Sequence, residues 1–235
     1  MRFIQVNQQM KIKDLSSFKK DEVMSLLGRV PFYRELQQAH PDQLEKILGF
    51  SCIVELEPGE VIMRRGDRGS WLYCLIKGSL VVYFDDPSDA QPLNTITPGE
   101  VFGDLALLCD HERKATVAAG SGERKVLLFA TDFKPFGDLS NFTTIDLKTK
   151  LIFYRTMVHS IRWRLEVHRM AEPGHPLAQE LLEMPLIREA KGSVGELEGL
   201  FQQARFLADL LDRWNGEDNR VVIEDVVVAT INSRV

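Results

Sequence analysis

Apolar residues between Cys52 and Ala130 come in short runs, and each run is bounded by residues typical of turns. The runs read CIVEL, VIM, WLYCLI, SLVVYF, NTI, ATVAA and KVLLFA, with PG, RGDRG, KG, DDPSD and GSGE between them. Runs of about 4 to 6 residues separated by such turn chemistry are typical of strands in a sandwich, barrel or roll. The exception is FGDLALL at residues 102–108, which predicts one or two helical turns.

One turn pattern occurs twice in this β region. Residues 57–61 read EPGEV and residues 97–101 read TPGEV. Proline presets the first turn dihedral and glycine supplies a left-handed one, so each PG is predicted to reverse the chain between antiparallel strands. A roll of two packed sheets would use such turns as its corners.

Helical patterns flank the β region. Residues 16–48 place apolar side chains at helical spacing and are interrupted by Gly28, Pro31 and Pro41, which predicts short helices broken at those points. After the last predicted strand, Asp132 in ATDFKPF is predicted to cap a helix. The β region is thus expected to follow a helical lead-in.

A long helix is predicted from Thr144 to about Met170, with apolar positions spaced alternately by four and three residues. The seam consists of Leu147, Leu151, Tyr154, Val158, Ile161, Leu165 and His168. A heptad seam either packs on its own domain or meets its twin in a dimer, and we favour the homodimer through residues 147–168. Off-seam residues would then cover the roll; they are Ile152, Phe153, Met157 and Trp163.

The segment after the long helix begins with AEPGHP at residues 171–176, which cannot continue a helix and predicts a hinge. ELEGLFQQARFLADLLDRW then carries one apolar stripe, which predicts an amphipathic helix ending at Asn215-Gly216. The final RVVIEDVVVATINSRV fits either a strand or a helix.

Composition narrows the class of protein. At 235 residues and 44% apolar, the chain can build one core with an appendage, or two small domains. No uninterrupted apolar window reaches 18 residues and the first residues lack the features of a secretory signal, so we expect a cytoplasmic protein without membrane contact. The three cysteines and five histidines form no ligand pattern, so we expect no metal.

The net charge of −5 is unevenly spread. Residues 171–235 contain twelve Asp and Glu against six Lys and Arg, a net charge of −6, which leaves +1 for residues 1–170. A region of that sign repels a phosphate backbone, so we expect a protein and not a nucleic acid as the partner of this acidic tail.

Residues 101–119, VFGDLALLCDHERKATVAA, combine features of an anion site. Gly103 precedes a predicted helix, so a phosphate can approach the N–H groups of residues 103–106. Arg113 would add a bidentate fork, and Asp104 would accept a hydrogen bond from a sugar hydroxyl. The set suits a sugar phosphate; alternatively, Asp104 only caps the helix and Arg113 pairs with it or with Asp110.

From about Leu26 to Met170 the chain resembles the cyclic nucleotide-binding domain family, the β-roll of catabolite activator proteins, kinase regulatory subunits and gated channels. The resemblance rests on ordered motifs. They are the cassette Phe102-Gly103-Asp104-Leu105-Ala106-Leu107, the following Arg113-Lys114-Ala115-Thr116-Val117, the turn Pro58-Gly59-Glu60, Gly66, and Ile76-Lys77-Gly78-Ser79-Leu80.

The resemblance implies an α+β fold: a cyclic nucleotide-binding β-roll with flanking helices, a long C-terminal helix and a small, mainly helical tail. The expected divisions are a lead-in at 1–48, the β-roll core at 49–142, the long helix at 143–170 and the acidic tail at 171–235. It also implies a lid or base contact from the long helix.

The resemblance further implies roles in the site. Arg113 would bind the cyclic phosphate, Gly103 and Ala106 would offer backbone N–H groups, and position 104 would hold the ribose 2′-hydroxyl. The ligand-binding set expected is Phe102, Gly103, Asp104, Leu105, Ala106, Arg113, Lys114 and Ala115.

Two residues depart from the family pattern. Asp104 replaces the usual glutamate, which withdraws the carboxylate by about 1.5 Å. Lys114 stands where a small residue is usual. It would either add a cation for a ligand with more phosphate, such as a cyclic dinucleotide, or extend into solvent.

We therefore expect a non-enzymatic cytosolic receptor for cAMP or cGMP, with cAMP favoured, whose long helix moves on binding and changes how the tail meets a protein partner. The alternatives are a dimerisation scaffold that has lost its ligand and a catabolite-activator-like regulator; the acidic tail without a basic recognition helix disfavours the latter. A cupin metalloenzyme would need histidines inside the barrel, and the β region offers only His111.

Overall fold

The structure is a computed structural model that describes residues 11–83, 87, 92, 94–109, 113, 115–122 and 125–217. Lys114 and residues 220–235, whose conformation the sequence left open between strand and helix, lie outside this set. In the described ranges, no helix has both the length and the apolar composition needed to cross a bilayer.

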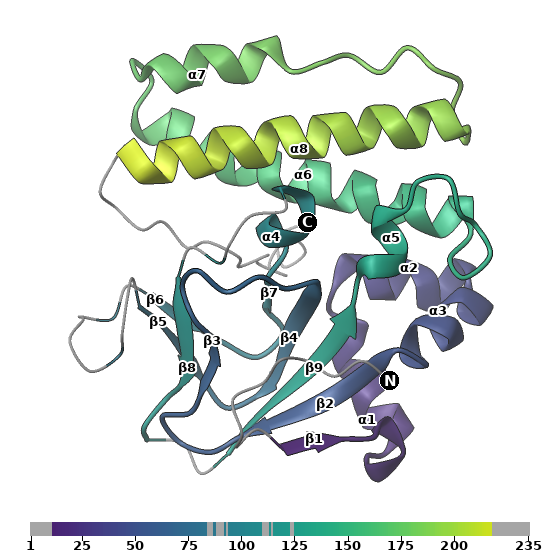
Figure 1. Cartoon of the computed structure of the whole chain (residues 1–235), viewed down its shortest axis with the longest axis vertical. Helices are drawn as coiled ribbons and strands as arrows, with labels where there is room; N and C mark the ends of the chain where they lie inside the picture. Colours follow the sequence, from purple (N-terminus) through teal and green to yellow (C-terminus); the bar gives the residue numbers. More distant parts are fainter. Residues whose placement is uncertain are drawn as a thin grey trace, which may run out of the picture.

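Two antiparallel sheets form the β region (Figure 1). The first has the order β1-β2-β9-β4-β7, from Lys11–Lys13, Ser51–Leu56, Val126–Asp132, Trp71–Lys77 and Val101–Phe102. The second has the order β3-β8-β5-β6, from Val61–Met63, Thr116–Ala119, Leu80–Tyr83 and Asn94–Ile96. All seven predicted strands are present.

Two further strands were not predicted. β7 has only two residues, and β1 lies inside the predicted helical lead-in, where it pairs with β2 in register Ile12↔Val54. Its lysines reach acids on or just after β2, since Lys13 pairs with Glu55 and Lys11 with Glu57. A strand this short is held by cross-strand pairs that no local pattern reveals.

The two PG turns are the corners of the roll. Gly59 and Gly99 have φ values of 76° and 96°, the left-handed conformation expected of them. In each turn the following glutamate accepts a backbone N–H three residues back, Glu60 from Glu57 at 2.9 Å and Glu100 from Thr97 at 2.7 Å. Each turn links strands of different sheets, which is the corner role predicted for it.

Short helices cover one face of the first sheet. They are α1 (Lys20–Leu27), α2 (Pro31–Ala39), α3 (Pro41–Leu48) and α5 (Lys134–Gly137). The boundaries between the first three helices lie where the sequence predicts them. The Tyr33 hydroxyl on α2 lies 3.0 Å from Thr131 Oγ1 on β9, so the helices are tied to the sheet as well as packed on it. The Asp132 carboxylate accepts the N–H of Lys134, the first residue of α5, at 3.1 Å, but the N-cap position is Phe133 and not Asp132 as predicted.

The core has two parts. One lies between the sheets, where Leu56, Leu75, Phe102 and Leu128 are fully buried. The other lies between the first sheet and the helices, and it continues without interruption into the C-terminal region.

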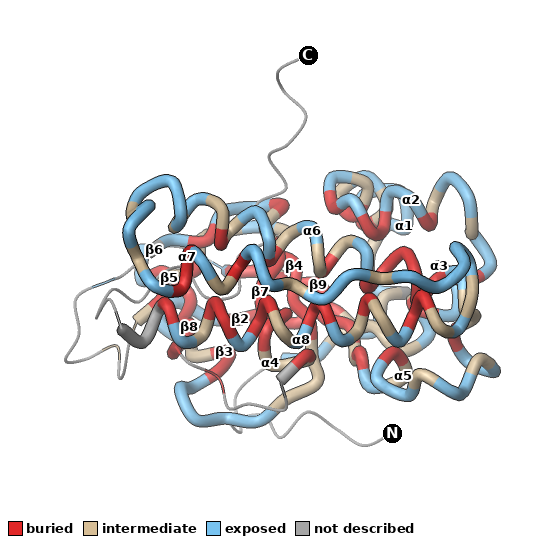
Figure 2. Tube along the Cα trace, turned by 90° about the horizontal axis from the view of Figure 1, so that it is seen from above, coloured by how far each residue is buried: buried red, intermediate tan, exposed pale blue. Residues whose placement is uncertain are grey.

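The C-terminal region is a packed layer. It contains α6 (Leu147–Ala171), α7 (Pro176–Glu180), the 3₁₀ turn η2 (Leu181–Glu183) and α8 (Val194–Glu217), with α8 lying along α6 (Figures 1 and 2). Arg155 pairs with Glu196 at 2.6 Å near one end, and His168 packs on Trp214 near the other, so the two helices run in the same direction.

This layer changes the interpretation of the heptad seam. Leu151, Tyr154, Ile161 and Leu165 are buried in the same cluster as Leu197, Leu200, Leu207 and Leu211 of α8. The seam therefore packs within the chain, which is the alternative that we did not favour. A homodimer through residues 147–168 would need this surface, and α8 already covers it.

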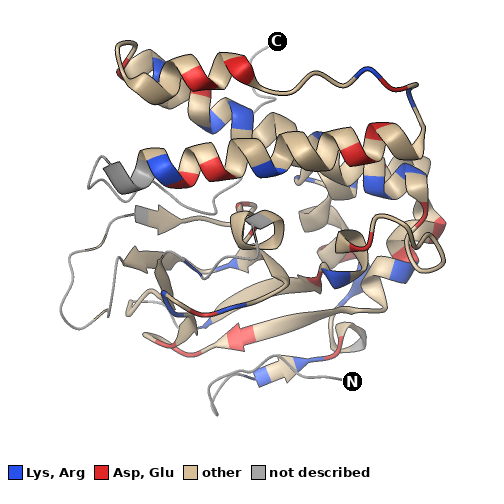
Figure 3. Cartoon of the chain, turned by 45° about the horizontal axis from the view of Figure 1, so that its top comes forward, with Lys and Arg blue, Asp and Glu red and all other residues tan. Residues whose placement is uncertain are grey.

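The acidic residues of the layer are partly paired. Figure 3 shows Asp and Glu interspersed with Lys and Arg over α6, α7 and α8. Glu196 binds Arg155, and Glu180 binds Arg213. The negative charge of residues 171–217 is thus partly balanced by ion pairs inside the layer.

Candidate functional site

The predicted helical turns after β7 form α4 (Leu105–Cys109), and Gly103 joins the two elements with φ 93°. A Cβ at this position would lie 2.8 Å from both Arg113 Nη1 and Trp71 O. Glycine is needed here for its left-handed conformation and for the close approach of these two groups.

Arg113 is held from two sides. Its Nη1 donates to Gly103 O at 3.0 Å and its Nη2 to Trp71 O at 2.9 Å. Its own backbone exchanges hydrogen bonds with the loop before β4, to Asp67 O and from the N–H of Gly66, both at 2.7 Å. Arg113 is 3% exposed, and these hydrogen bonds fix the orientation of its guanidinium.

Asp104 has a partner that the sequence did not suggest. Its Oδ2 lies 2.6 Å from Arg164 Nη2 on α6, and its Oδ1 accepts the N–H of Leu105 at 3.0 Å. The carboxylate is fully buried. The acid therefore contacts both α4 and α6, and the cation that it pairs with is Arg164 and not Arg113.

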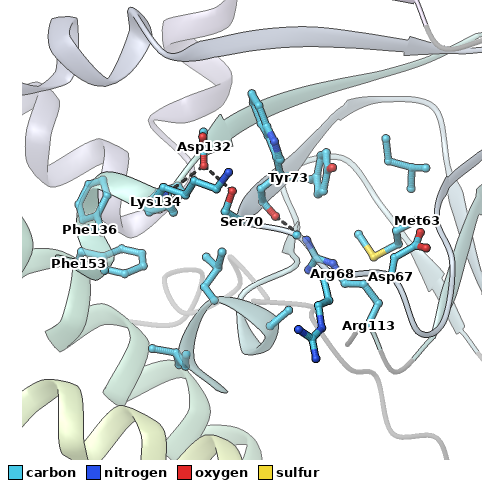
Figure 4. A pocket seen from close by; sticks show the side chains of 18 of the residues that line it. Met63, Asp67, Arg68, Ser70, Tyr73, Arg113, Asp132, Lys134, Phe136 and Phe153 are labelled. Atoms are coloured by element: carbon cyan, nitrogen blue, oxygen red, sulfur yellow. Dashed lines mark hydrogen bonds between the residues drawn. The ribbon is translucent and has the colours of Figure 1, made fainter. Parts of the chain in front are cut away.

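A pocket of about 790 Å³ lies between the roll, α4, α5 and α6 (Figure 4). Arg113 lines it together with residues 106–108 of α4, and aromatic side chains from α6 and from α5 and the residue before it form one wall. The aromatic set is Phe133, Phe136, Phe153 and Tyr154. The pocket combines the fixed cation of Arg113 with further charged side chains at Asp67, Arg68, Asp132 and Lys134 and with one aromatic wall. This combination suits a compact anion that carries a ring system.

A second polar group lies across the pocket from Arg113 (Figure 4). Ser70 Oγ donates to Asp132 Oδ1 at 2.6 Å, and Lys134 stands beside them. Burial raises the pKa of Tyr73 to about 12 and raises the pKa of Tyr154, so both phenols in the pocket stay protonated at neutral pH. Tyr154 donates to Phe136 O at 3.1 Å.

The structure brings some predicted ligand residues to the pocket and leaves others outside it. Arg113 and Ala106 line the pocket. Phe102 stacks on Tyr73 in the core at 5.2 Å, and Leu105 and Ala115 are buried in the core clusters. Lys114 is not described, so its contribution stays a prediction.

Sequence reasoning missed the loop that holds Arg113. Residues 67–71 line the pocket, and a Cβ on Gly69 would lie 3.3 Å from Arg113 Nη2. The signal was the RGDRG stretch, which we interpreted only as a turn. The described residues contain no group of three or more His, Cys, Asp or Glu side chains able to hold a metal ion.

In comparison with known proteins, residues 53–136 match the family model of the cyclic nucleotide-binding domain. A cGMP-dependent protein kinase of Plasmodium berghei is 31% identical over 109 residues, which are 46% of this chain and 12% of the kinase. A cAMP-dependent protein kinase type II regulatory subunit of Drosophila melanogaster is 34% identical over 118 residues, 50% of this chain and 29% of the subunit.

A solved structure of a cyclic nucleotide-binding domain from Methylobacillus flagellatus shares the fold. It superposes with a TM-score of 0.52 at 12% identity and covers 69% of this chain and 87% of that domain. The chain spans less than a third of the length of the curated relatives it matches.

Proposed function

Residues 53–136 of this chain belong to the cyclic nucleotide-binding domain family, and from this premise we propose that the chain is a non-enzymatic receptor for cAMP or cGMP. The observation that carries the proposal is the guanidinium of Arg113, buried and fixed in the wall of a pocket of nucleotide size. An arginine fork matches the two free oxygens of a cyclic phosphate, and a buried charged contact is stronger than an exposed one.

The phosphate would lie at Arg113 and the start of α4, and the ring system against the apolar wall. Ala106 and Leu107 supply the α4 side of the pocket. Phe153 and Tyr154 supply the α6 side, which supports the expected base contact from the long helix. The choice between adenine and guanine stays open in this proposal.

Ligand binding would be transmitted through α6 and α8. α6 lines the pocket, carries Arg164, which binds the cassette, and packs along α8, which also contacts α4. A ligand that prefers one position of α4 would therefore shift both long helices, by as much as its affinities for the two states differ. We propose that the acidic C-terminal layer presents this change to a protein partner.

Some earlier expectations stay proposals. They are the four divisions of the chain, a location in the cytoplasm and a protein partner. The dimer through residues 147–168 is no longer part of the proposal, because α8 of the same chain covers the seam. A scaffold without ligand is the second candidate, since the Asp104–Arg164 pair gives the acid a structural role.

Titration calorimetry with cAMP, cGMP and a cyclic dinucleotide tests the proposal. We expect one of them to bind, and Arg113→Ala to weaken that binding at least tenfold, about 1.4 kcal/mol. Arg162→Ala, an exposed cation on α6, is the matched control and should bind as the wild type does. No heat and no thermal shift with any ligand at millimolar concentration would favour the scaffold.

A further inference from the structure

We propose that this chain binds its cyclic nucleotide without using the ribose 2′-hydroxyl, so that its ligand class includes 2′-deoxyribose cyclic phosphates. The inference rests on the proposed function. It reverses what the resemblance implied for position 104, and it starts from the ion pair between Asp104 and Arg164.

Both oxygens of the Asp104 carboxylate already have partners. Oδ1 accepts the N–H of Leu105 at 3.0 Å and Oδ2 accepts Arg164 Nη2 at 2.6 Å. A carboxylate has further lone pairs, but Asp104 is fully buried and does not line the pocket. A ligand in the pocket therefore meets α4 through residues 106–108 and not through this acid.

A ribose hydroxyl cannot displace Arg164 at low cost. The hydroxyl is a neutral donor, whereas the guanidinium forms a charge-assisted bond, which is the stronger of the two. Arg164 also has no substitute partner among the described residues, because its Nε and Nη1 are buried and lack hydrogen-bond acceptors there. Removing Asp104 from Arg164 would leave a buried guanidinium unpaired, which is strongly unfavourable.

The shorter side chain fits this arrangement. Asp104 stands one carbon closer to the backbone than the glutamate that the family pattern leads us to expect, and its carboxylate meets an arginine from α6. In this chain the acid links the cassette to the long helix. Recognition then depends on the phosphate at Arg113 and the ring system at the apolar wall.

The test measures two dissociation constants on the full chain, one for the cyclic nucleotide that binds more tightly and one for its 2′-deoxy analogue. The ratio of the second constant to the first gives the contribution of the 2′-hydroxyl. Loss of a hydrogen bond to a charged group is expected to weaken binding by about tenfold or more, so a ratio below about threefold supports the inference. A ratio of about threefold or more would overturn the inference, and its disappearance in Asp104→Asn would identify Asp104 as the group that binds the hydroxyl.

Two variants separate the causes. Asp104→Asn keeps the side-chain shape, and we expect it to leave the ratio unchanged. Arg164→Met releases the carboxylate, and we expect it to raise the preference for the ribose form. An unchanged ratio in this variant would also contradict the inference, provided that circular dichroism shows an intact fold. If the wild type binds neither nucleotide, the proposed function fails and this inference with it, an outcome distinct from binding with a large ratio.

Discussion

Gly103 and Arg113 are in close contact: the glycine carbonyl accepts a hydrogen bond from Nη1 at 3.0 Å, and the space beside its Cα is filled by the guanidinium. The same glycine has φ 93° and ends β7 before α4. One backbone position thus determines both the start of the cassette helix and the orientation of the arginine.

Gly103→Ala should reduce ligand affinity at least tenfold, because the added Cβ would lie 2.8 Å from Nη1 and from Trp71 O and would displace the guanidinium. Gly59→Ala is the matched control, since Gly59 also has positive φ but nothing within 4 Å of the added Cβ. Both variants carry a left-handed alanine, which costs about 1 to 2 kcal/mol of stability. Calorimetric affinities that fall equally in both variants would show that Arg113 is not the cause.

Arg164→Met should lower the free energy of unfolding by about 3 to 5 kcal/mol, because it leaves the buried Asp104 carboxylate without its cation. Urea unfolding followed by circular dichroism measures this loss. Arg162→Met on the exposed side of α6 should change stability by less than about 0.5 kcal/mol. Combining Arg164→Met with Asp104→Asn should recover part of the loss, and equal losses in the single and double variants would contradict the pairing.

Ile161→Ala tests the intramolecular seam. Ile161 is fully buried in the cluster shared with α8, so the substitution should cost about 2 to 5 kcal/mol of unfolding free energy. Val167→Ala, at a position 47% exposed on the same helix, should cost less than about 0.5 kcal/mol. The unfolding midpoint should be independent of protein concentration over a roughly hundredfold range; a midpoint that rises with concentration would restore the dimer.

Glu55 should make the free energy of unfolding depend on pH in the acid range. Hydrogen bonds from Lys125 and Lys13 lower the pKa of Glu55 from 4.5 to about 2. Because the folded pKa is the lower one, this contribution is complete above pH 4.5 and is lost as the pH falls toward about 2. Glu55→Gln should be less stable at neutral pH and should show a shallower decline across that window.

Urea unfolding at a series of pH values between neutrality and about pH 2 measures this effect. Glu22→Gln is the control, because the Glu22 side chain forms an exposed pair with Lys19 at 3.6 Å. If Glu55→Gln and the wild type give parallel curves, then the ion pairs between β1, β2 and the Lys125 side chain do not contribute as the structure indicates.

Local patterns were enough for most elements. Alternating short apolar runs and turn residues predicted seven strands, and Gly28, Pro31 and Pro41 marked the breaks between α1, α2 and α3, because period and turn chemistry act within a few residues. The strands β1 and β7 were missed since each is too short to show a period and exists through pairing with a distant strand. The repeated PG pattern identified two turns but not which sheets they join.

In the candidate site, too, the sequence identified the residues but not their contacts. The order of glycine, acid and arginine along residues 101–119 was sufficient to single out Gly103, Asp104 and Arg113, because their chemistry is local. What each one contacts was decided by the tertiary structure. Arg113 meets Trp71, 42 residues away, and Asp104 meets Arg164, 60 residues away, and no short-range pattern encodes such pairs.

Side-chain type and spacing along the chain are enough to identify the apolar faces, the turns and the residues that can bind an anion, because these properties are local. What covers each apolar face depends on contacts between segments that are far apart in the chain, and these contacts are visible in the fold alone. A heptad seam needs an apolar partner but does not specify one, and here α8 lies against it where a second chain was expected. The buried acid likewise needed a cation, and the fold supplied Arg164 from α6.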